Sequence, residues 1–580
     1  MKRSSRIVAL GLMASPLVAG ASDAPHGLPL ENIHNREAVV SPQCYTRTEG
    51  RANPCYTCHQ SYENKNRPNY MGDGRLQGEY DFSEFAMTNH WSNLFRDRSE
   101  EVAAISDEEI RSYIAEDNYS ALAGRLESMG WTGFVPDLEN LELGNGAFDE
   151  HGFARDGSGW VAFNYKPLPS TFWPTNGSTD DVLLRLPEKF RQTSCHGETV
   201  DSTDAYRANL AILEAAIKDL PTIGSLPIDE KAICIDLDGD GELGMVTQIE
   251  RPDHYVGDAE DVPVAAMLYP EGIQFLHTVR YVGVEDDGRI THTPRMKEVR
   301  YMKKLAFHDR EELRSIYEEL EHDHEHGHEE HDDHHAHDDH DKHGHHGDHE
   351  EKDGHDAHHA DEMAGHDDHD EHHGHEHGDD EVLEQYVDTG HGLKNEFGWL
   401  VLGFIEDQGG ELRPQTAEEQ LFCMGCHSSI GATIDQTFAF PRKVTGSEGW
   451  GYIDLEGMKD APNVGEVDGE ILTYFERVGG GSEFRNNPEM KARWFTEDGE
   501  VKREKVEAAD VYDLITPSPE RALRLNKAYR VIVEEQSFIH GRDATITPPE
   551  NVFEEIDPDT VPLPEEHRYD WDIRLDWSQT

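Results

Sequence analysis

The sequence predicts an α+β protein in which a mixed α/β middle region separates two regions that are mainly helical with long loops. Apolar residues recur every three to four positions over 205–220, so we expect a helix there, capped by Asp204 and stopped by Pro221. Shorter apolar runs predict strands at 232–235, 245–249 and 279–284. Both kinds of element are therefore expected in one chain.

Other segments complete this outline. Acidic residues and alanines alternate with apolar residues over 99–116 and 118–129, which predicts two helices. The stretch 137–180 is rich in Gly and Asp and predicts loops with short strands. Asp309 and Glu312 have the spacing of a capping box, so another helix should begin there and run towards residue 320.

The N-terminus has the pattern of a signal peptide. Three basic residues precede an apolar stretch at 7–20, and small residues follow at 19–21. The stretch is too short to span a bilayer and is interrupted by Pro16. The first cysteine is Cys44, so a lipid anchor at the cleavage site is not expected. We predict cleavage near Ala21, a periplasmic or secreted chain, and no integral membrane segment.

The chain is strongly acidic, with a formal net charge of -66 and only 36% hydrophobic residues. Residues 321–381, the His-rich tract, hold 25 acidic residues and 22 of the 36 histidines. A segment of this composition cannot bury enough apolar surface to offset its ordering entropy, so we expect a disordered insertion. The charge excludes nucleic acid as a partner.

Imidazoles beside carboxylates are suitable ligands for divalent zinc, copper or nickel ions. The alternative is a solvated acidic spacer without bound metal. The adjacent histidine pairs are the candidate ligands: His334, His335, His345, His346, His358 and His359.

The composition divides the chain into five parts. They are the signal peptide (1–21), a first haem c region (22–130), a mixed α/β region (131–320), the His-rich tract (321–381) and a second haem c region (382–580).

That division rests on two pentapeptides of one pattern: Cys55, Cys58 and His59 in the first, and Cys423, Cys426 and His427 in the second. On a helix, positions i, i+3 and i+4 share one face, so both thiols and the imidazole can approach the same ring. A redox CxxC pair or half a zinc site would explain the cysteines but not the histidine that follows both pairs. The pattern therefore predicts two covalently attached haems.

The flanking residues favour helices at both motifs. Thr416 and Glu419 form a capping box, and good helix formers lead from there to the second motif. At the first motif Asn53 can cap a helix and Pro54 suits its first position.

At these motifs the chain resembles the c-type cytochromes as a broad class. The resemblance implies haem c, His59 and His427 as proximal iron ligands, and single-electron transfer between redox partner proteins. An iron with an open distal position would instead imply a dihaem oxidoreductase, either peroxidase-like or acting on a small sulfur compound. A metal-handling protein that uses the His-rich tract is the third hypothesis.

The distal ligands remain open at the level of sequence. A methionine would raise the haem potential and a second histidine would lower it. For the first haem we favour His90 over Met71 and Met87. For the second haem the candidates are His391, Met458 and Met490.

An acidic run with glycines is similar to the first half of an EF-hand loop. Carboxylates at alternate positions can converge on a hard cation such as Ca²⁺, but Thr247 stands where the loop needs a bidentate glutamate. An acidic turn between strands is the alternative. The candidate calcium ligands are Asp236, Asp238, Asp240 and Glu242.

Three cysteines remain outside the motifs, namely Cys44, Cys195 and Cys234. We favour a disulfide between Cys195 and Cys234, which leaves Cys44 over. Because His196 follows Cys195, a haem held by a single thioether is a second interpretation, and Cys195 as an iron ligand is a third.

Overall fold

The structure is a computed structural model that describes residues 38–46, 54–58, 82–169, 174–318, 386–427, 433–478, 487–556 and 572–580. The predicted signal peptide, His59, Met71 and the His-rich tract with its six candidate histidines lie outside the described residues. The side chain of Cys55 also lies outside them.

Helices and antiparallel sheets are both present, as the α+β prediction requires. The largest sheet has eight strands in the order β1-β2-β7-β8-β11-β10-β9, with β12 paired to β11. Two-stranded sheets are formed by β3 with β4 and by β5 with β6. The strands are β1 (Val161–Ala162), β2 (Thr179–Arg185), β3 (Gln192–Thr193), β4 (Val200–Asp201), β5 (Thr222–Asp229), β6 (Met245–Glu250), β7 (Gln274–Val284), β8 (Ile290–Lys304), β9 (Tyr386–Asp388), β10 (Leu393–Asn395), β11 (Trp399–Glu406) and β12 (Leu412–Pro414).

The large sheet joins parts of the chain that the His-rich tract separates in sequence. Its central strands β7 and β8 pair with each other, and residues 298–304 of β8 pair with β11, for example Val299 with Phe404. β8 precedes the tract and β11 follows it. Residues from the predicted middle region and from the predicted second haem region therefore share one sheet.

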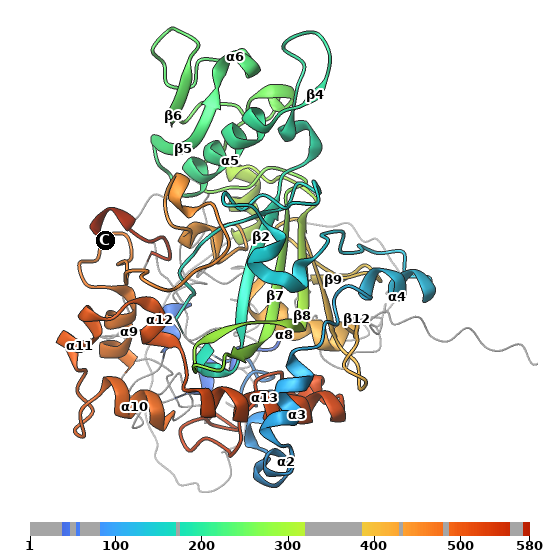
Figure 1. Cartoon of the computed structure of the whole chain (residues 1–580), viewed down its shortest axis with the longest axis vertical. Coiled ribbons are helices and arrows are strands. Elements are labelled where there is room, and N and C mark those ends of the chain that lie inside the picture. The colour runs from blue at the N-terminus through green and yellow to red at the C-terminus, as the bar shows by residue number, and fades with distance from the viewer. Residues whose placement is uncertain are drawn as a thin grey trace, which may run out of the picture.

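Helices surround this sheet and a smaller lobe extends from it. α13 packs against β7, whereas α5 packs against the β5–β6 hairpin at the top of Figure 1. The helices are α2 (Ser99–Ala104), α3 (Asp107–Ile114), α4 (Leu122–Ser128), α5 (Thr203–Ile217), α6 (Glu230–Ile233), α8 (Ala417–His427), α9 (Glu470–Val478), α10 (Pro488–Trp494), α11 (Arg503–Ala508), α12 (Val511–Ile515) and α13 (Pro519–Glu535). A further helix begins at residue 310 and is described as far as residue 318.

Several predicted elements are confirmed, with different ends. α5 is the helix predicted at 205–220, but Ser202 caps it by accepting a hydrogen bond from the backbone N–H of Ala205. Asp204 instead accepts from the backbone N–H of Asp229. Asp309 and Glu312 exchange backbone-to-side-chain hydrogen bonds in both directions, as the predicted capping box requires.

One local prediction was wrong, and two predicted helical ranges contain shorter helices than expected. The segment predicted as a strand at 232–235 contains the end of helix α6, because the Asp229 side chain caps the helix at Lys231 and Cys234 ends it in the left-handed conformation. The helices predicted over 99–116 and 118–129 are three shorter ones, α2, α3 and α4. Ser106 starts a new helix inside the first of these ranges by capping Glu109.

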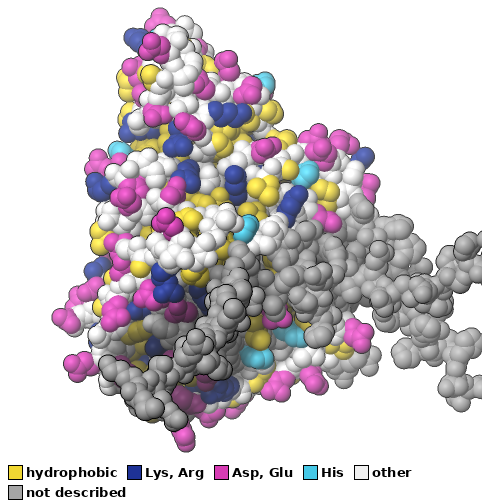
Figure 2. Space-filling view, turned by 90° about the vertical axis from the view of Figure 1, so that its right-hand side faces the viewer, with side chains coloured by type: hydrophobic (Ala, Val, Ile, Leu, Met, Phe, Trp, Pro, Cys, Tyr) yellow, Lys and Arg dark blue, Asp and Glu magenta, His cyan; other side chains and the backbone are white. Residues whose placement is uncertain are grey.

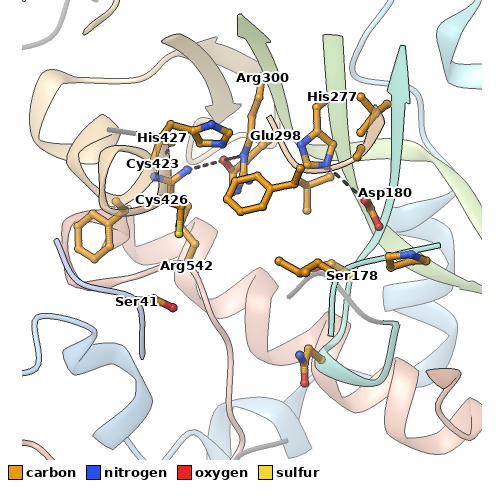
Figure 3. Close-up of a pocket in the computed structure, with 18 of the residues that line it drawn as sticks. Ser41, Ser178, Asp180, His277, Glu298, Arg300, Cys423, Cys426, His427 and Arg542 are labelled. Atoms are coloured by element: carbon orange, nitrogen blue, oxygen red, sulfur yellow. Dashed lines mark hydrogen bonds and ion pairs between the residues drawn. The ribbon is translucent and has the colours of Figure 1, made fainter. Parts of the chain in front are cut away.

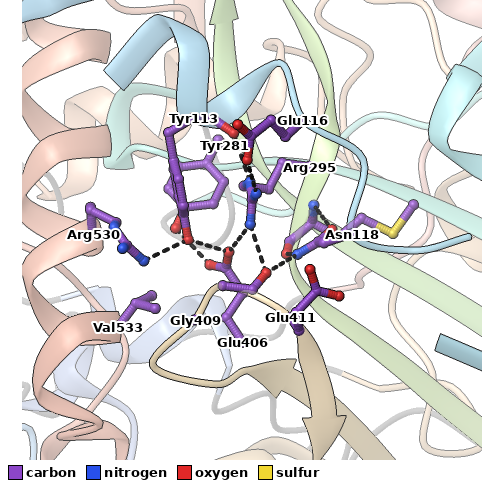
Figure 4. Close-up of polar contacts among 12 residues, drawn as sticks. Tyr113, Glu116, Asn118, Tyr281, Arg295, Glu406, Gly409, Glu411, Arg530 and Val533 are labelled. Carbon is purple, nitrogen blue, oxygen red and sulfur yellow. Dashed lines mark hydrogen bonds and ion pairs between the residues drawn. The ribbon is translucent and has the colours of Figure 1, made fainter. Parts of the chain in front are cut away.

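A buried polar network fastens helix α3 to the sheet (Figure 4). Glu406 on β11 accepts hydrogen bonds from the hydroxyls of Tyr113 at 2.7 Å and Tyr281 at 2.6 Å. Arg295 on β8 donates to the same carboxylate at 3.0 Å. The guanidinium carbons of Arg295 and Arg530 lie 3.8 and 4.2 Å from the centre of the Tyr113 ring.

The described surface carries charge of both signs. On the face shown in Figure 2, acidic side chains are spread widely, with lysine and arginine between them. Among the described residues, none of the helices has both the length and the apolar character needed to cross a bilayer.

Candidate functional site

Helix α8 carries the second CxxCH motif and has a firmly fixed start. The backbone N–H of Glu419 donates to the Thr416 hydroxyl at 3.2 Å, and the N–H of Thr416 donates to the Glu419 carboxylate at 2.8 Å. This is the predicted capping box. Arg413 adds two hydrogen bonds to the same carboxylate, at 2.8 and 2.9 Å. The motif therefore lies at the end of a helix whose first turn is fixed by the capping box and by Arg413.

Cys423, Cys426 and His427 line one cavity, as their spacing on a helix predicts (Figure 3). The two thiols are not in a disulfide. Phe422, Phe438 and other apolar side chains share the cavity wall with them. Two unpaired thiols and an imidazole on the wall of an apolar cavity are the donor set that a covalently attached haem needs.

The floor of the cavity is one face of the large sheet. Alternate residues of a strand point to the same face, and directly paired residues of neighbouring strands do so too. Val182 on β2 pairs with His277 on β7, which pairs with Arg300 on β8. The next row pairs Asp180, Val279 and Glu298 in the same order. All six side chains line the cavity.

The first motif reaches the same cavity from the other end of the sequence. Pro54 begins a four-residue 3-10 helix that ends at Thr57, and Cys58 directly after it lines the cavity. Burial raises the pKa of the Cys58 thiol, and the neighbouring thiols of Cys426 and Cys44 raise it further. Thiols from the two motifs are therefore close enough to affect each other's ionisation.

A glycine inside the second motif permits this approach. A Cβ atom at Gly425 would lie only 2.1 Å from the backbone oxygen of Val39. The N–H of Val39 in turn donates to the carbonyl of Leu421 on α8, at 3.3 Å. The chain segment that precedes the first motif thus lies directly against the helix that carries the second.

His427 has one ring nitrogen fixed by the protein. Its Nδ1 lies 3.0 Å from the carbonyl oxygen of Gln436, which leaves Nε2 as the nitrogen that can bind a metal. Burial, together with the charges of Arg300 and His277, lowers the pKa of His427 to about 4 against the opposing hydrogen bond from the backbone at Gln436. The imidazole is neutral at neutral pH, as iron coordination requires.

Charged groups occupy one side of the cavity. Glu298 accepts hydrogen bonds from Arg300 at 3.0 and 3.1 Å, and it also pairs with Arg542. Arg542 approaches the Cys423 sulfur at 3.6 Å. Lys297 is the extra residue of a bulge in β8, so it can line the cavity beside Glu298. Burial lowers the pKa of Lys297 to about 7.

The distal ligands predicted from sequence do not line this cavity. His90 stacks on Phe85 with ring centres 3.9 Å apart, and its Nε2 lies 3.1 Å from the Phe85 carbonyl oxygen. His391 packs edge-on against Trp131. Met458 and Met490 are buried in a separate apolar cluster with α9 and α12. Within the described residues these four side chains and Met87 are absent from the cavity wall.

His277, Asp180, Arg300 and Arg542 were not among the site residues predicted from sequence. The predicted strand began at residue 279, whereas β7 begins at Gln274. A histidine between Phe275 and Val279, at alternate positions of an apolar strand, was the available signal, because such a position faces the interior.

The remaining candidate sites lie in the smaller lobe. Cys195 and Cys234 form the expected disulfide, which leaves Cys44 outside it. In the acidic loop, carboxylate oxygens of Asp236, Asp238 and Glu230 lie within 4.8 Å of one another, a set that omits Asp240 and Glu242. Asp236 accepts backbone hydrogen bonds from Gly239 and Gly241. Calcium binding stays a prediction, and a helix, α6, precedes the loop where we expected a strand.

Comparison with known proteins places the chain in a family. A family model with the description "-like lipoprotein" matches residues 29–364 and 359–513. A protein of Aquifex aeolicus (strain VF5) named "Uncharacterized lipoprotein" is 31% identical over 614 residues, which cover 94% of this chain and 93% of that protein. No solved structure matches the chain. The chain therefore belongs to this lipoprotein-like family.

Proposed function

We propose that the chain is an exported dihaem c-type cytochrome that transfers single electrons between redox partners outside the cytoplasm. The observation that carries the proposal is the convergence of the two motifs. Cys58 from the first motif and Cys423 from the second line one cavity, although 365 residues separate them in the sequence.

The residues present suit covalent haem. Cys58, Cys423 and Cys426 are unoxidised and face the cavity, so they are available for thioether bonds. His427 is held through Nδ1 and keeps Nε2 for iron. A haem bound there supplies an iron that takes up and releases one electron at a time. Cys58 of the first motif and Cys423 and Cys426 of the second would hold the two haems at one cavity.

Membership of a lipoprotein-like family supports export. The basic and apolar N-terminal residues support cleavage near Ala21 and a periplasmic location.

A dihaem oxidoreductase is the second candidate. One observation favours it, namely that the titratable pair His277 and Asp180 lies on the cavity floor, where it could exchange protons with a small substrate.

Covalent haem is tested by producing the full chain together with the haem-ligation machinery and measuring its denatured mass. We expect two porphyrins per chain. Replacing Cys423 and Cys426 by serine should remove one porphyrin, and the same change at Cys55 and Cys58 should remove the other, because a haem without thioethers is lost on denaturation.

Cys44→Ser is the matched control and should keep both porphyrins, since Cys44 belongs to neither motif. A colourless wild-type chain, or a mass without porphyrin, refutes the proposal.

A further inference from the structure

His277 occupies the middle of the cavity floor. It lies on β7 between Val182 on one neighbouring strand and Arg300 on the other. Phe275 and Val279, two positions away on either side, also line the cavity. His277 thus lies among both apolar and charged side chains in the centre of the floor, on the face that also lines the cavity with α8.

The ring of His277 is positioned by a carboxylate. Its Nε2 lies 3.5 Å from Oδ2 of Asp180, and the Tyr165 hydroxyl donates a hydrogen bond to the same oxygen. Asp180 is 7% exposed, so solvent hardly competes for it. A histidine that binds a metal through one nitrogen commonly gives its other nitrogen to a carboxylate or a backbone carbonyl. His427 has the second kind of partner in Gln436, and the Asp180 carboxylate lies at ion-pair distance from Nε2 of His277.

His277 and His427 both line the cavity, His277 from β7 and His427 from α8. In Figure 3 the edge of the His277 ring that is turned away from Asp180 faces the side of the cavity where Arg300 and His427 lie. The two side chains come from a strand and a helix that contribute to the same cavity wall.

We propose that His277 is the distal axial ligand of the haem whose proximal ligand is His427, with Asp180 as the positioning residue that holds its ring. This inference rests on the proposed function, since it requires a haem at the second motif. Met302 is the other cavity-lining side chain of the described residues, besides the two histidines, that offers a customary sixth ligand. It lies in the next row of the floor, paired with Phe275.

The experiment uses the full chain with both haems attached and compares wild type, His277→Ala and Met302→Leu. The readouts are porphyrin content, the ferric paramagnetic resonance spectrum and carbon monoxide binding to the reduced protein. We expect His277→Ala to keep two porphyrins but to convert one iron from low spin to high spin and open it to carbon monoxide. Added imidazole should restore the low-spin signal, which a merely structural defect would not allow.

Met302→Leu is the matched control because it preserves the size of a neighbouring side chain on the same floor. It should leave the spin state unchanged. The inference is overturned if His277→Ala leaves both irons as in wild type, or if Met302→Leu opens an iron. It is also overturned if the wild-type haem at His427 is already high spin and binds carbon monoxide, which would favour the oxidoreductase. Absence of porphyrin from the wild type would instead refute the proposed function.

Asp180→Asn tests the positioning role. The amide cannot draw the imidazole proton as the carboxylate does, so the ring becomes a weaker electron donor to iron. We expect the spin state to stay low and the midpoint potential of one haem to rise. An unchanged midpoint potential would show that Asp180 does not act on the haem through His277.

Discussion

Glu298 on β8 and Glu406 on β11 are buried carboxyl groups on paired strands, yet their pKa values move in opposite directions. Burial raises the pKa of both. For Glu298, the charges of Arg300 and Arg542 outweigh burial and lower the pKa to about 2. For Glu406, burial outweighs the hydrogen bonds from Tyr281 and Tyr113, and the pKa rises to about 7.

The difference lies in how the arginines are shared. Glu298 receives two guanidinium groups and an amide hydrogen bond from Gln415. Glu406 receives one guanidinium, that of Arg295, which also binds Glu116 and the carbonyl of Gly410. Neutral hydroxyl donors therefore lower the pKa of a buried carboxyl group less than a second guanidinium charge does. The carboxylate beside the cavity stays ionised at neutral pH, and the one beneath α3 titrates there.

The largest effect expected from this comparison is that of Glu298→Gln. Removing one partner of a buried ion pair leaves the guanidinium groups of Arg300 and Arg542 uncompensated, so the free energy of unfolding should fall by about 3–5 kcal/mol. Urea unfolding at pH 7 measures it. The matched control is Glu507→Gln in the exposed cluster around Arg503, where about 0–1 kcal/mol is expected. Equal losses of unfolding free energy in the two variants would contradict the conclusion that Glu298 compensates two buried guanidinium groups.

The pH dependence of stability should differ in sign between the two sites. The folded-state pKa of Glu298 lies below the ordinary value of 4.5, so its contribution is complete above pH 4.5 and is lost as the pH falls towards 2. The folded-state pKa of Glu406 lies above 4.5, so its contribution is complete below pH 4.5 and is lost as the pH rises through 7. Across each of these pH ranges, the carboxyl group's contribution to the free energy of unfolding should change by about 3 kcal/mol.

Urea unfolding of wild type and Glu406→Gln at pH 5 and pH 8 tests the second window. Wild type should lose more stability than the variant over this interval, because glutamine cannot ionise. Parallel losses in the two proteins would show that Glu406 titrates in its ordinary range.

The smallest effect concerns Tyr113→Phe. The change removes one hydrogen bond to Glu406 and should cost about 1 kcal/mol of unfolding free energy. That hydrogen bond lowers the pKa of Glu406, so its loss should move the pH window of the preceding test upwards. Leu143→Ala, at an exposed apolar side chain, serves as the control and should leave the window in place. If Tyr113→Phe loses stability over the same pH range as wild type, Tyr113 does not affect the pKa of Glu406.

Much of the local structure followed from short-range chemistry. The capping boxes at Thr416 and Asp309 form as predicted, because each needs only residues three positions apart. Pro54 begins a helix as predicted, but this is a four-residue 3-10 helix that ends at Thr57, so Cys58 follows the helix and does not lie on it. The predicted strand at 232–235 failed because Asp229 and Cys234, an N-cap and a left-handed terminus, outweighed the β propensity of two isoleucines.

The cavity could not be predicted in this way. It requires β8 to pair with β11 across the His-rich tract, and the backbone of Val39 to contact α8 at Gly425. Neither contact leaves a periodic signal in the sequence. His277 was missed for the same reason, since its role depends on which face of β7 the sheet turns towards α8.

The sequence by itself determined the export signal, the two CxxCH motifs and the helix that presents the second one, because each depends on residues within one or two turns of each other. Only the tertiary structure decided that both motifs open into one cavity and that His277 and Asp180 form part of its floor. Strand pairing and close backbone contact between distant segments made that decision, and their energies depend on the whole packed molecule and not on any one stretch of chain.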